Sequence, residues 1–317
     1  MDDVTRRGRK GLAAAFALAG VTGALDASAA FAGDTSLSQP ESVGAPSTTI
    51  GGAIKTYFDS WEERVQTARA TQPEWSSPLV TTTAMLEERV RFDIAFQRTG
   101  NGADMTDIDG GKGLDLIVGE STEIQIAAAP YVIRTAPSGK GQLSGFNDWP
   151  FFRIKERLFS SPQDAGDYVV SAWVQTQAAT GISALTNHAF TVLPTLGFGK
   201  GFGPFVIQGT FGAVIPTAYE YTLGTQLASN LAFQYHLWQV LWPQMEINWT
   251  HYLGGQRGGK DQVFLTPGVV VGRFLLTDRL KFTVGAGYQF AIEPHYQASP
   301  LLPAYNHEWL VTTRLTF

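Results

Sequence analysis

Charged side chains stand at alternate positions in two stretches of the chain. Residues 89–97 read Arg-Val-Arg-Phe-Asp-Ile-Ala-Phe-Gln, and residues 152–158 read Phe-Arg-Ile-Lys-Glu-Arg-Leu. Because successive side chains of a β-strand point to opposite faces, each stretch would be charged on one face and apolar on the other. Guanidinium, ammonium and carboxylate groups facing an enclosed space could select solutes by charge. They could also form ion pairs that stiffen a wall, and the two roles are compatible.

The same reasoning extends to charged residues of other predicted strands. The predicted lumen-lining residues, which would bind or select solutes, are Arg89, Arg91, Asp93, Glu123, Arg153, Lys155, Arg157, Glu246, Arg273, Lys281 and Arg314.

Covalent chemistry finds little support in the sequence. The chain has no cysteine and five histidines, and no histidine pair has metalloprotease spacing. His251 could face lipid as in outer-membrane lipases, but no serine lies two residues away. The glycines of 197–203 resemble a phosphate-binding loop only in number, and we expect a tight hairpin there. We therefore predict no enzyme, no catalytic residue, no cofactor and no metal site.

The last residues, Trp309 to Phe317, form the clearest strand pattern in the chain. Trp309, Val311 and Leu315 would lie on one face and Arg314 on the other. A terminal aromatic residue after such alternation is typical of the closing strand of an outer-membrane β-barrel. We expect barrel assembly machinery to recognise this end through Phe317.

The N-terminus has the pattern of a secretory signal peptide over residues 1–32. A basic region precedes the apolar stretch 12–19, and Ala30-Phe31-Ala32 fits a cleavage site. No apolar run of about 18 residues follows, so any membrane span would have to be a closed barrel. The whole chain has a net charge of −5, which argues against a nucleic-acid partner.

Residues 33–74 are predicted to contain a linker and one amphipathic helix. Ile54, Phe58, Trp61 and Val65 recur at helical spacing within 53–70. Two positions are open for this helix: the periplasmic rim of a barrel, or the lumen as a plug.

Residues 75–317 alternate with the period of strands and predict an all-β, antiparallel transmembrane barrel of about twelve strands. Long outer loops are expected at 99–111, 134–147 and 293–306, and one strand near 220–237. Twelve strands about 4.8 Å apart and tilted by about 40° give a backbone diameter of roughly 24 Å. Such a lumen would be too narrow for a wide general porin.

Several short motifs stand in barrel-like order along residues 75–317. They are Trp75-Ser-Ser-Pro78-Leu-Val-Thr81, Leu86-Glu-Glu-Arg89, Leu193-Pro-Thr195, Ile215-Pro-Thr217, Leu265-Thr-Pro-Gly268 and Gly285-Ala-Gly-Tyr-Gln-Phe290. This part of the chain resembles the outer-membrane transporter family named for the MetA pathway of phenol degradation. The resemblance implies a barrel that passes small, often aromatic, compounds, and it identifies no transport residue.

The function that we expect is a bacterial outer-membrane channel that passes small, possibly hydrophobic or aromatic, solutes by facilitated diffusion. Its partners would be outer-membrane lipid and a small-molecule solute. A structural or adhesin-like barrel acting through its outer loops is the first alternative. An outer-membrane lipid hydrolase is the second.

Overall fold

The computed structural model describes residues 50–99, 102–136, 139, 141–294, 302 and 304–317. The predicted signal peptide and the first part of the predicted linker lie outside the described residues. So does most of the predicted loop at 293–306.

The described chain begins with helices and continues as antiparallel strands. The helices are α1 (Ile50–Asp59), α2 (Trp61–Ala70), the short α3 (Glu220–Leu223) and one 3-10 turn, η1 (Gly255–Arg257). The strands are β1 (Arg89–Arg98), β2 (Asp104–Ile108), β3 (Gly113–Ile117), β4 (Thr122–Ala127), β5 (Tyr131–Thr135), β6 (Gln142–Phe146), β7 (Trp149–Ser161), β8 (Tyr168–Ala178), β9 (Thr191–Phe202), β10 (Phe205–Pro216), β11 (Gln226–Tyr235), β12 (Leu241–Tyr252), β13 (Asp261–Leu275), β14 (Lys281–Glu293) and β15 (His307–Thr316).

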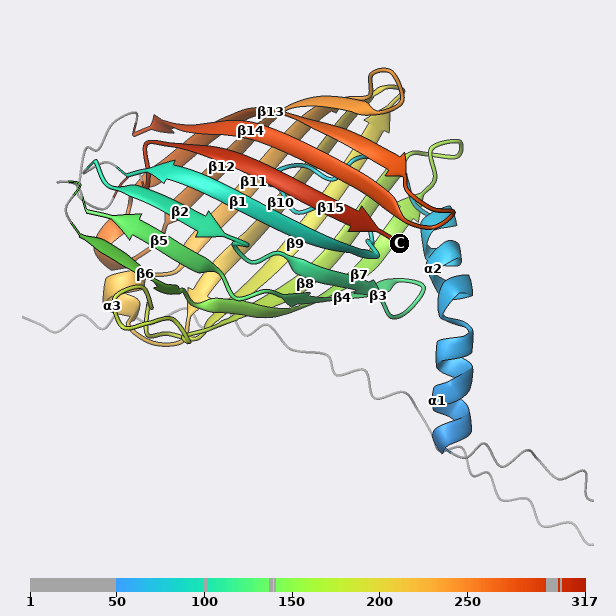
Figure 1. Cartoon of the computed structure of the whole chain (residues 1–317), viewed down its shortest axis with the longest axis horizontal. Helices are drawn as coiled ribbons and strands as arrows, with labels where there is room; N and C mark the ends of the chain where they lie inside the picture. Colours follow the sequence, from blue (N-terminus) through green and yellow to red (C-terminus); the bar gives the residue numbers. More distant parts are fainter. Residues whose placement is uncertain (1–49, 100–101, 137–138, 140, 295–301, 303) are drawn as a thin grey trace, which may run out of the picture. The chain divides into compact units, whose positions relative to one another are not determined.

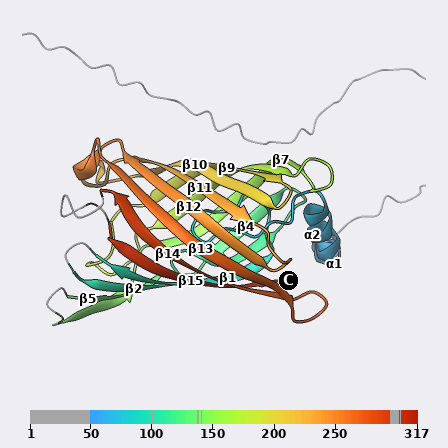
Figure 2. The same cartoon turned by 90° about the horizontal axis from the view of Figure 1, so that it is seen from above.

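These strands form one sheet that closes on itself. Each of β7 to β14 pairs with the next strand along the chain, and β15 returns to pair with β1 over ten residues, from Arg89 opposite Thr316 to Arg98 opposite His307. Closure removes the free edges of the wall except at the short strand β6, which pairs only with β5. Figures 1 and 2 show the strands wrapped around a barrel. The predicted antiparallel β-barrel is confirmed.

Three of the wall strands are interrupted. The strand β2 pairs with β1 from Ile94 to Arg98, and β3 pairs with β1 at Arg89 and Val90. Because both pair with the same strand, β2 and β3 are two halves of one wall strand. The pairs β4 and β5, and β6 and β7, continue each other in the same way. Counted like this, the described residues form twelve wall strands, as predicted.

Four local predictions need correction. The loops predicted at 99–111 and 134–147 contain β2 and β6, which extend the wall beyond the expected strands. The strand predicted from residue 220 begins only at Gln226, because helix α3 comes first and Gly224 has a positive φ of 65°. The single helix predicted over 53–70 is two helices separated at Ser60.

The two faces of the wall differ as the sequence alternation predicts. On β15, Trp309 and Val311 are exposed on the outer face, whereas Thr312 and Arg314 are buried inside. On β1, Phe92 and Phe96 are exposed, and Arg91 and its inward neighbours are buried. The wall is therefore apolar outside and polar inside along these strands.

The helices α1 and α2 lie outside the lumen, at the end of the barrel where β15 ends (Figures 1 and 2). The indole N–H of Trp61 donates to Glu88 Oε1 at 2.9 Å, and Arg69 donates to the backbone oxygen of Phe317 at 2.6 Å. Of the two positions open for the predicted helix, the structure thus has the rim. No helix among the described residues is long and apolar enough to cross a membrane.

Candidate functional site: a chain segment inside the barrel

The lumen is occupied by residues 72–88, which connect α2 to β1 and which we call the luminal segment. The segment has no helix or strand, yet Trp75, Leu79, Ala84 and Met85 are all at most 1% exposed. It enters and leaves at the same end, because the side chain of Gln72 bonds both the backbone N–H and the carbonyl of Leu86, at 2.9 and 2.8 Å. A buried loop must find partners for its backbone, and the wall supplies them.

One carboxylate of the wall binds the turn of the luminal segment. Glu246 on β12 is fully buried and accepts backbone N–H bonds from Leu79 at 2.7 Å, Val80 at 2.9 Å and Thr81 at 2.6 Å. Hydrogen bonds to an ionised acceptor are stronger than bonds between neutral groups. Glu246 is therefore the anchor of this turn on the β12 side.

A row of three hydrogen-bonded glutamines, one each on β10, β11 and β12, ends at this carboxylate. The amide of Gln208 donates to Gln234 at 2.7 Å, Gln234 donates to Gln244 at 2.9 Å, and Gln244 donates to Glu246 Oε1 at 2.6 Å. Gln208 also donates to the carbonyl of Ser76 at 2.9 Å. The row of amides links β10, β11 and β12 to the same segment.

Two guanidinium groups hold the other side of the turn. Arg314 on β15 donates to the carbonyls of Ser77 at 2.5 Å and Pro78 at 2.7 Å, and Arg91 on β1 donates to the carbonyl of Leu79. The turn therefore presents N–H groups to an anion on β12 and carbonyl groups to cations on β1 and β15. Its peptide dipoles and the charges of the wall are complementary.

Glycines of the wall make room for the two largest apolar residues of the segment. A Cβ atom at Gly199 would lie 2.4 Å from the ring of Trp75, and one at Gly268 would lie 2.4 Å from Leu79. Leu79 also lies over Gly287, where a Cβ would be 2.7 Å away. A larger residue at these positions would collide with the segment. Of the glycines of 197–203, Gly199 thus serves this packing, and Gly203, with a positive φ of 64°, lies in the hairpin turn between β9 and β10.

A lattice of ion pairs lines the wall beside the returning half of the segment. Arg153 contacts Asp115 and Glu123 at 3.0 Å each, Arg89 contacts Asp115 at 2.9 Å, and Lys155 contacts Glu123 at 2.9 Å. The lattice also binds the segment, because Lys155 donates to the carbonyl of Met85 and Glu123 accepts the N–H of Glu87. Each charge has a partner, which the burial of so many ions requires.

The predicted lumen-lining residues fall into three groups in the structure. Those buried inside the barrel are Arg89, Arg91, Asp93, Glu123, Arg153, Lys155, Glu246 and Arg314. Arg157 and Arg273 lie toward the rim, where Arg157 donates to the carbonyl of Ala68 at 2.6 Å and Arg273 to that of Trp75 at 2.6 Å. Lys281 is exposed at the same end. Most of these charges therefore hold the luminal segment or one another.

Sequence reasoning missed the segment and some of its anchors. Asp167, in the turn between β7 and β8, accepts the indole N–H of Trp75 at 2.9 Å, and burial raises the pKa of its carboxyl group. Glu87 accepts a hydrogen bond from Ser77 and lies 3.4 Å from Arg89. The signal available in the sequence was the alternation of inward glycines at 197–201 and 285–287, which leaves space that the wall itself does not fill.

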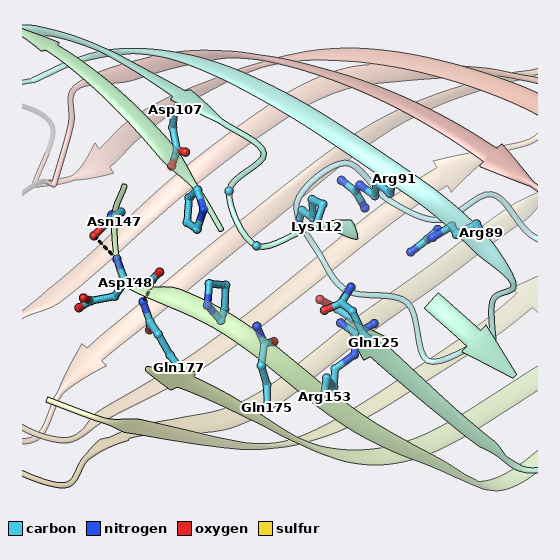
Figure 3. Close-up of a pocket in the computed structure, with 15 residues that line it drawn as sticks. Arg89, Arg91, Asp107, Lys112, Gln125, Asn147, Asp148, Arg153, Gln175 and Gln177 are labelled. Carbon is cyan, nitrogen blue, oxygen red and sulfur yellow. Dashed lines mark hydrogen bonds between the residues drawn. The ribbon is translucent and has the colours of Figure 1, made fainter. Parts of the chain in front are cut away.

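Space remains on the side of the segment away from the helices. One cavity of about 300 Å³ lies between Thr82 of the segment and the wall, at the points where β2 to β7 are interrupted. Figure 3 shows its polar lining, with side chains from several strands directed toward a common space. Two smaller cavities, of about 170 and 140 Å³, share lining residues with it.

Comparisons with known proteins give limited similarity. No protein-family model matches the chain, and no curated protein matches it. Among solved structures, the chain is similar to an outer-membrane channel from Pseudomonas putida F1, with 10% identity and a TM-score of 0.43 over 72% of this chain and 92% of that one. It is also similar to the NanC porin, with 8% identity and a TM-score of 0.42 over 72% and 98% of the two chains. At these scores, the assignment of the barrel rests on the strand pairing of this chain itself.

Proposed function

We propose that the protein is a bacterial outer-membrane channel that passes small solutes by facilitated diffusion around its luminal segment. The observation that carries this proposal is the contrast between the two faces of a closed barrel. Exposed Phe92, Phe96, Leu196, Phe211 and Trp309 cover the outside, and buried ions and amides line the inside. Lipid can accept the first surface. The second surface needs polar partners, which are the luminal segment and, in the space that remains, water or a polar solute.

The luminal segment makes the proposed passage narrow. Its residues take part in hydrogen bonds with β1, β4, β7, β8, β10, β12, β13 and β15, so the wall holds it from all sides. A solute must use the cavities that remain beside Thr82, which suits small molecules and excludes large ones. The resemblance of residues 75–317 to the MetA-pathway family supports aromatic compounds as one class of solute.

Conductance tests this proposal directly. The full chain, folded in detergent and inserted into a planar bilayer, should give small single-channel currents, and liposomes containing it should swell in small organic solutes but not in large sugars. A barrel that gives neither current nor swelling would be a structural or adhesin-like protein. Hydrolysis of bilayer phospholipid would instead support an enzyme.

A further inference from the structure

We propose that the 300 Å³ cavity is a binding site for a small organic acid, with its carboxylate among the cations of the wall and its apolar body toward β8 to β11. This inference rests on the proposed function, since it names the class of solute that the channel would take. The cavity, its charges and its neighbouring apolar space each contribute one step.

The cavity is lined by more positive than negative charge. Arg89, Arg91, Lys112 and Arg153 contribute cations, and Asp107 and Asp148 contribute carboxylates. Figure 3 shows the two carboxylates on one side and the arginines on the other, with Lys112 between them. The three arginines are ion-paired with carboxylates of the wall and of the luminal segment, so the attraction of an anion depends mainly on Lys112. Enclosure by protein strengthens that attraction relative to water.

Two of these cations have donors that the protein does not use. Lys112 makes no ion pair with any residue in the described part of the chain, although it lies in the loop between β2 and β3 and faces the cavity. Arg153 is 4% exposed, and its Nε has no hydrogen-bond partner among the described residues, whereas its Nη2 is bound by Asp115 and Glu123. A buried guanidinium N–H without an acceptor is costly, so an acceptor supplied by a solute would be stabilised there.

The opposing carboxylates do not neutralise these donors equally. Asp148 accepts the backbone N–H groups of Gly181 at 3.2 Å and Asn187 at 2.8 Å, so its charge organises the following loop. Asp107 has one oxygen with no partner in the described residues. Of the two carboxylates that line the cavity, Asp107 is therefore the one that can oppose a solute. Asp93 also attracts Lys112 from the adjoining cavity, but it is ion-paired with Arg91.

The body of the solute has an adjacent space that is partly apolar. The 140 Å³ cavity shares Thr82 and Gln175 with the larger one. Trp173, Leu193 and Val214 line it together with the polar residues Thr195, Thr210 and Asn230. A molecule with its carboxylate beside Lys112 can extend past Thr82 into this space. The pair of cavities therefore fits an acid with a compact apolar group better than it fits inorganic phosphate.

Calorimetric titration of the full chain folded in detergent tests the site without requiring transport. Benzoate is the probe, and benzamide, benzylamine, acetate and phosphate are the comparisons. We expect benzoate to bind at least tenfold more tightly than its neutral isostere benzamide and than benzylamine, because only benzoate accepts charge-assisted hydrogen bonds. Acetate and phosphate should bind more weakly than benzoate, because neither has an apolar group that reaches Trp173 and Leu193 in the smaller cavity.

Two variants separate the charge from the apolar contact. Lys112→Gln should weaken benzoate about tenfold. Its matched control, Lys281→Gln, makes the same change at the exposed rim and should have no effect. Leu193→Ala should weaken benzoate but not acetate. A gel shift between boiled and unboiled samples shows that each variant has folded.

Several outcomes would overturn the proposal. They are equal binding of benzoate and benzamide, tighter binding of benzylamine, or the same affinity in the Lys112 and Lys281 variants. If Lys112→Gln does not fold, the comparison of probes on the natural chain still decides. A protein that binds benzoate but conducts nothing would retain the site and lose the proposed channel function. A conducting protein without preference for benzoate would lose only the site.

Discussion

Replacing Glu246 with glutamine should loosen the luminal segment without altering the wall. The carboxylate accepts three backbone N–H bonds, from Leu79, Val80 and Thr81. An amide oxygen can still accept from Leu79 and Val80, which share Oε1, but the amide NH2 group would face the N–H of Thr81. One buried donor is then unsatisfied, and the two remaining bonds to the segment become neutral ones; the bond from Gln244 also becomes neutral, but it stays within the wall whether or not the turn is released.

The size of the effect follows from these bonds. Each charged-to-neutral change costs about 1 kcal/mol, and an unsatisfied buried N–H costs about 1–3 kcal/mol. Burying a neutral amide costs less than burying an ion, which offsets part of the loss. A net weakening of about 2–4 kcal/mol remains, so the population of the released state of the turn should rise by between roughly thirtyfold and a thousandfold.

Hydrogen exchange and conductance measure this change independently. In E246Q, amide exchange in the peptide covering residues 72–88 should accelerate by that factor, and single-channel currents should show larger and more frequent open events. Glu308→Gln is the matched control, because Glu308 is a buried luminal carboxylate on β15 that accepts a hydrogen bond from the side chain of Gln97 rather than from the segment. Equal exchange and equal currents in the two variants would show that Glu246 does not anchor the turn.

Four further predictions concern the contacts around the segment and the rim. Gly199→Ala should destabilise the barrel by about 1–3 kcal/mol in urea titration, because the added methyl group collides with Trp75, whereas Gly51→Ala, which meets nothing within 4 Å, should not. Burial raises the pKa of Asp167, so the folded state binds its proton more tightly than the unfolded state, and stability should fall as the pH rises from the ordinary aspartate range toward neutrality. Asp167→Asn tolerates the positive φ of 54° and can still accept from Trp75, so the urea midpoint of this variant should lose that pH dependence; an unchanged profile would contradict the role of Asp167. A chain lacking residues 33–70 should keep its conductance and ion selectivity, because the helices lie at the rim, and a clear increase would mean that they obstruct the passage. Deletion of Phe317 should reduce the yield of heat-modifiable barrel in membranes, and an undiminished yield would argue against recognition of the terminal ring.

Period-two alternation predicted the wall well because it is a local property of each strand. On β14, Phe282 and Val284 point outward while Gly285 and Gly287 point inward, as expected from the sequence. The interruptions of β2 to β7 were harder to predict, because Gly110, Gly111 and Pro130 read as ordinary turn residues. Only the pairing of both halves with the same neighbour shows that they break a continuous strand.

The luminal segment could not be predicted, because nothing local specifies it. Residues 72–88 have neither helical nor strand periodicity, and their partners lie up to 237 residues away, as between Ser77 and Arg314. The charged residues that face the lumen were identified correctly as inward residues of strands. What they bind was not, since the acceptors for Arg91 and Arg314 are backbone carbonyls of a coil.

The bonds of the luminal segment also set an order for the assembly of the barrel. The segment is synthesised before every strand, yet its turn is held by Arg91 of the first strand, Glu246 of β12 and Arg314 of the last. An unfinished sheet that lacks β15 can supply the bonds of Glu246 and Arg91 but not those of Arg314, so the turn is fully held only after the final strand pairs with β1. Closure of the barrel and completion of the bonds to the segment are then one event. The same contacts give the last strand a template, because the carbonyls of Ser77 and Pro78 accept its guanidinium only when Thr313 stands opposite Phe92.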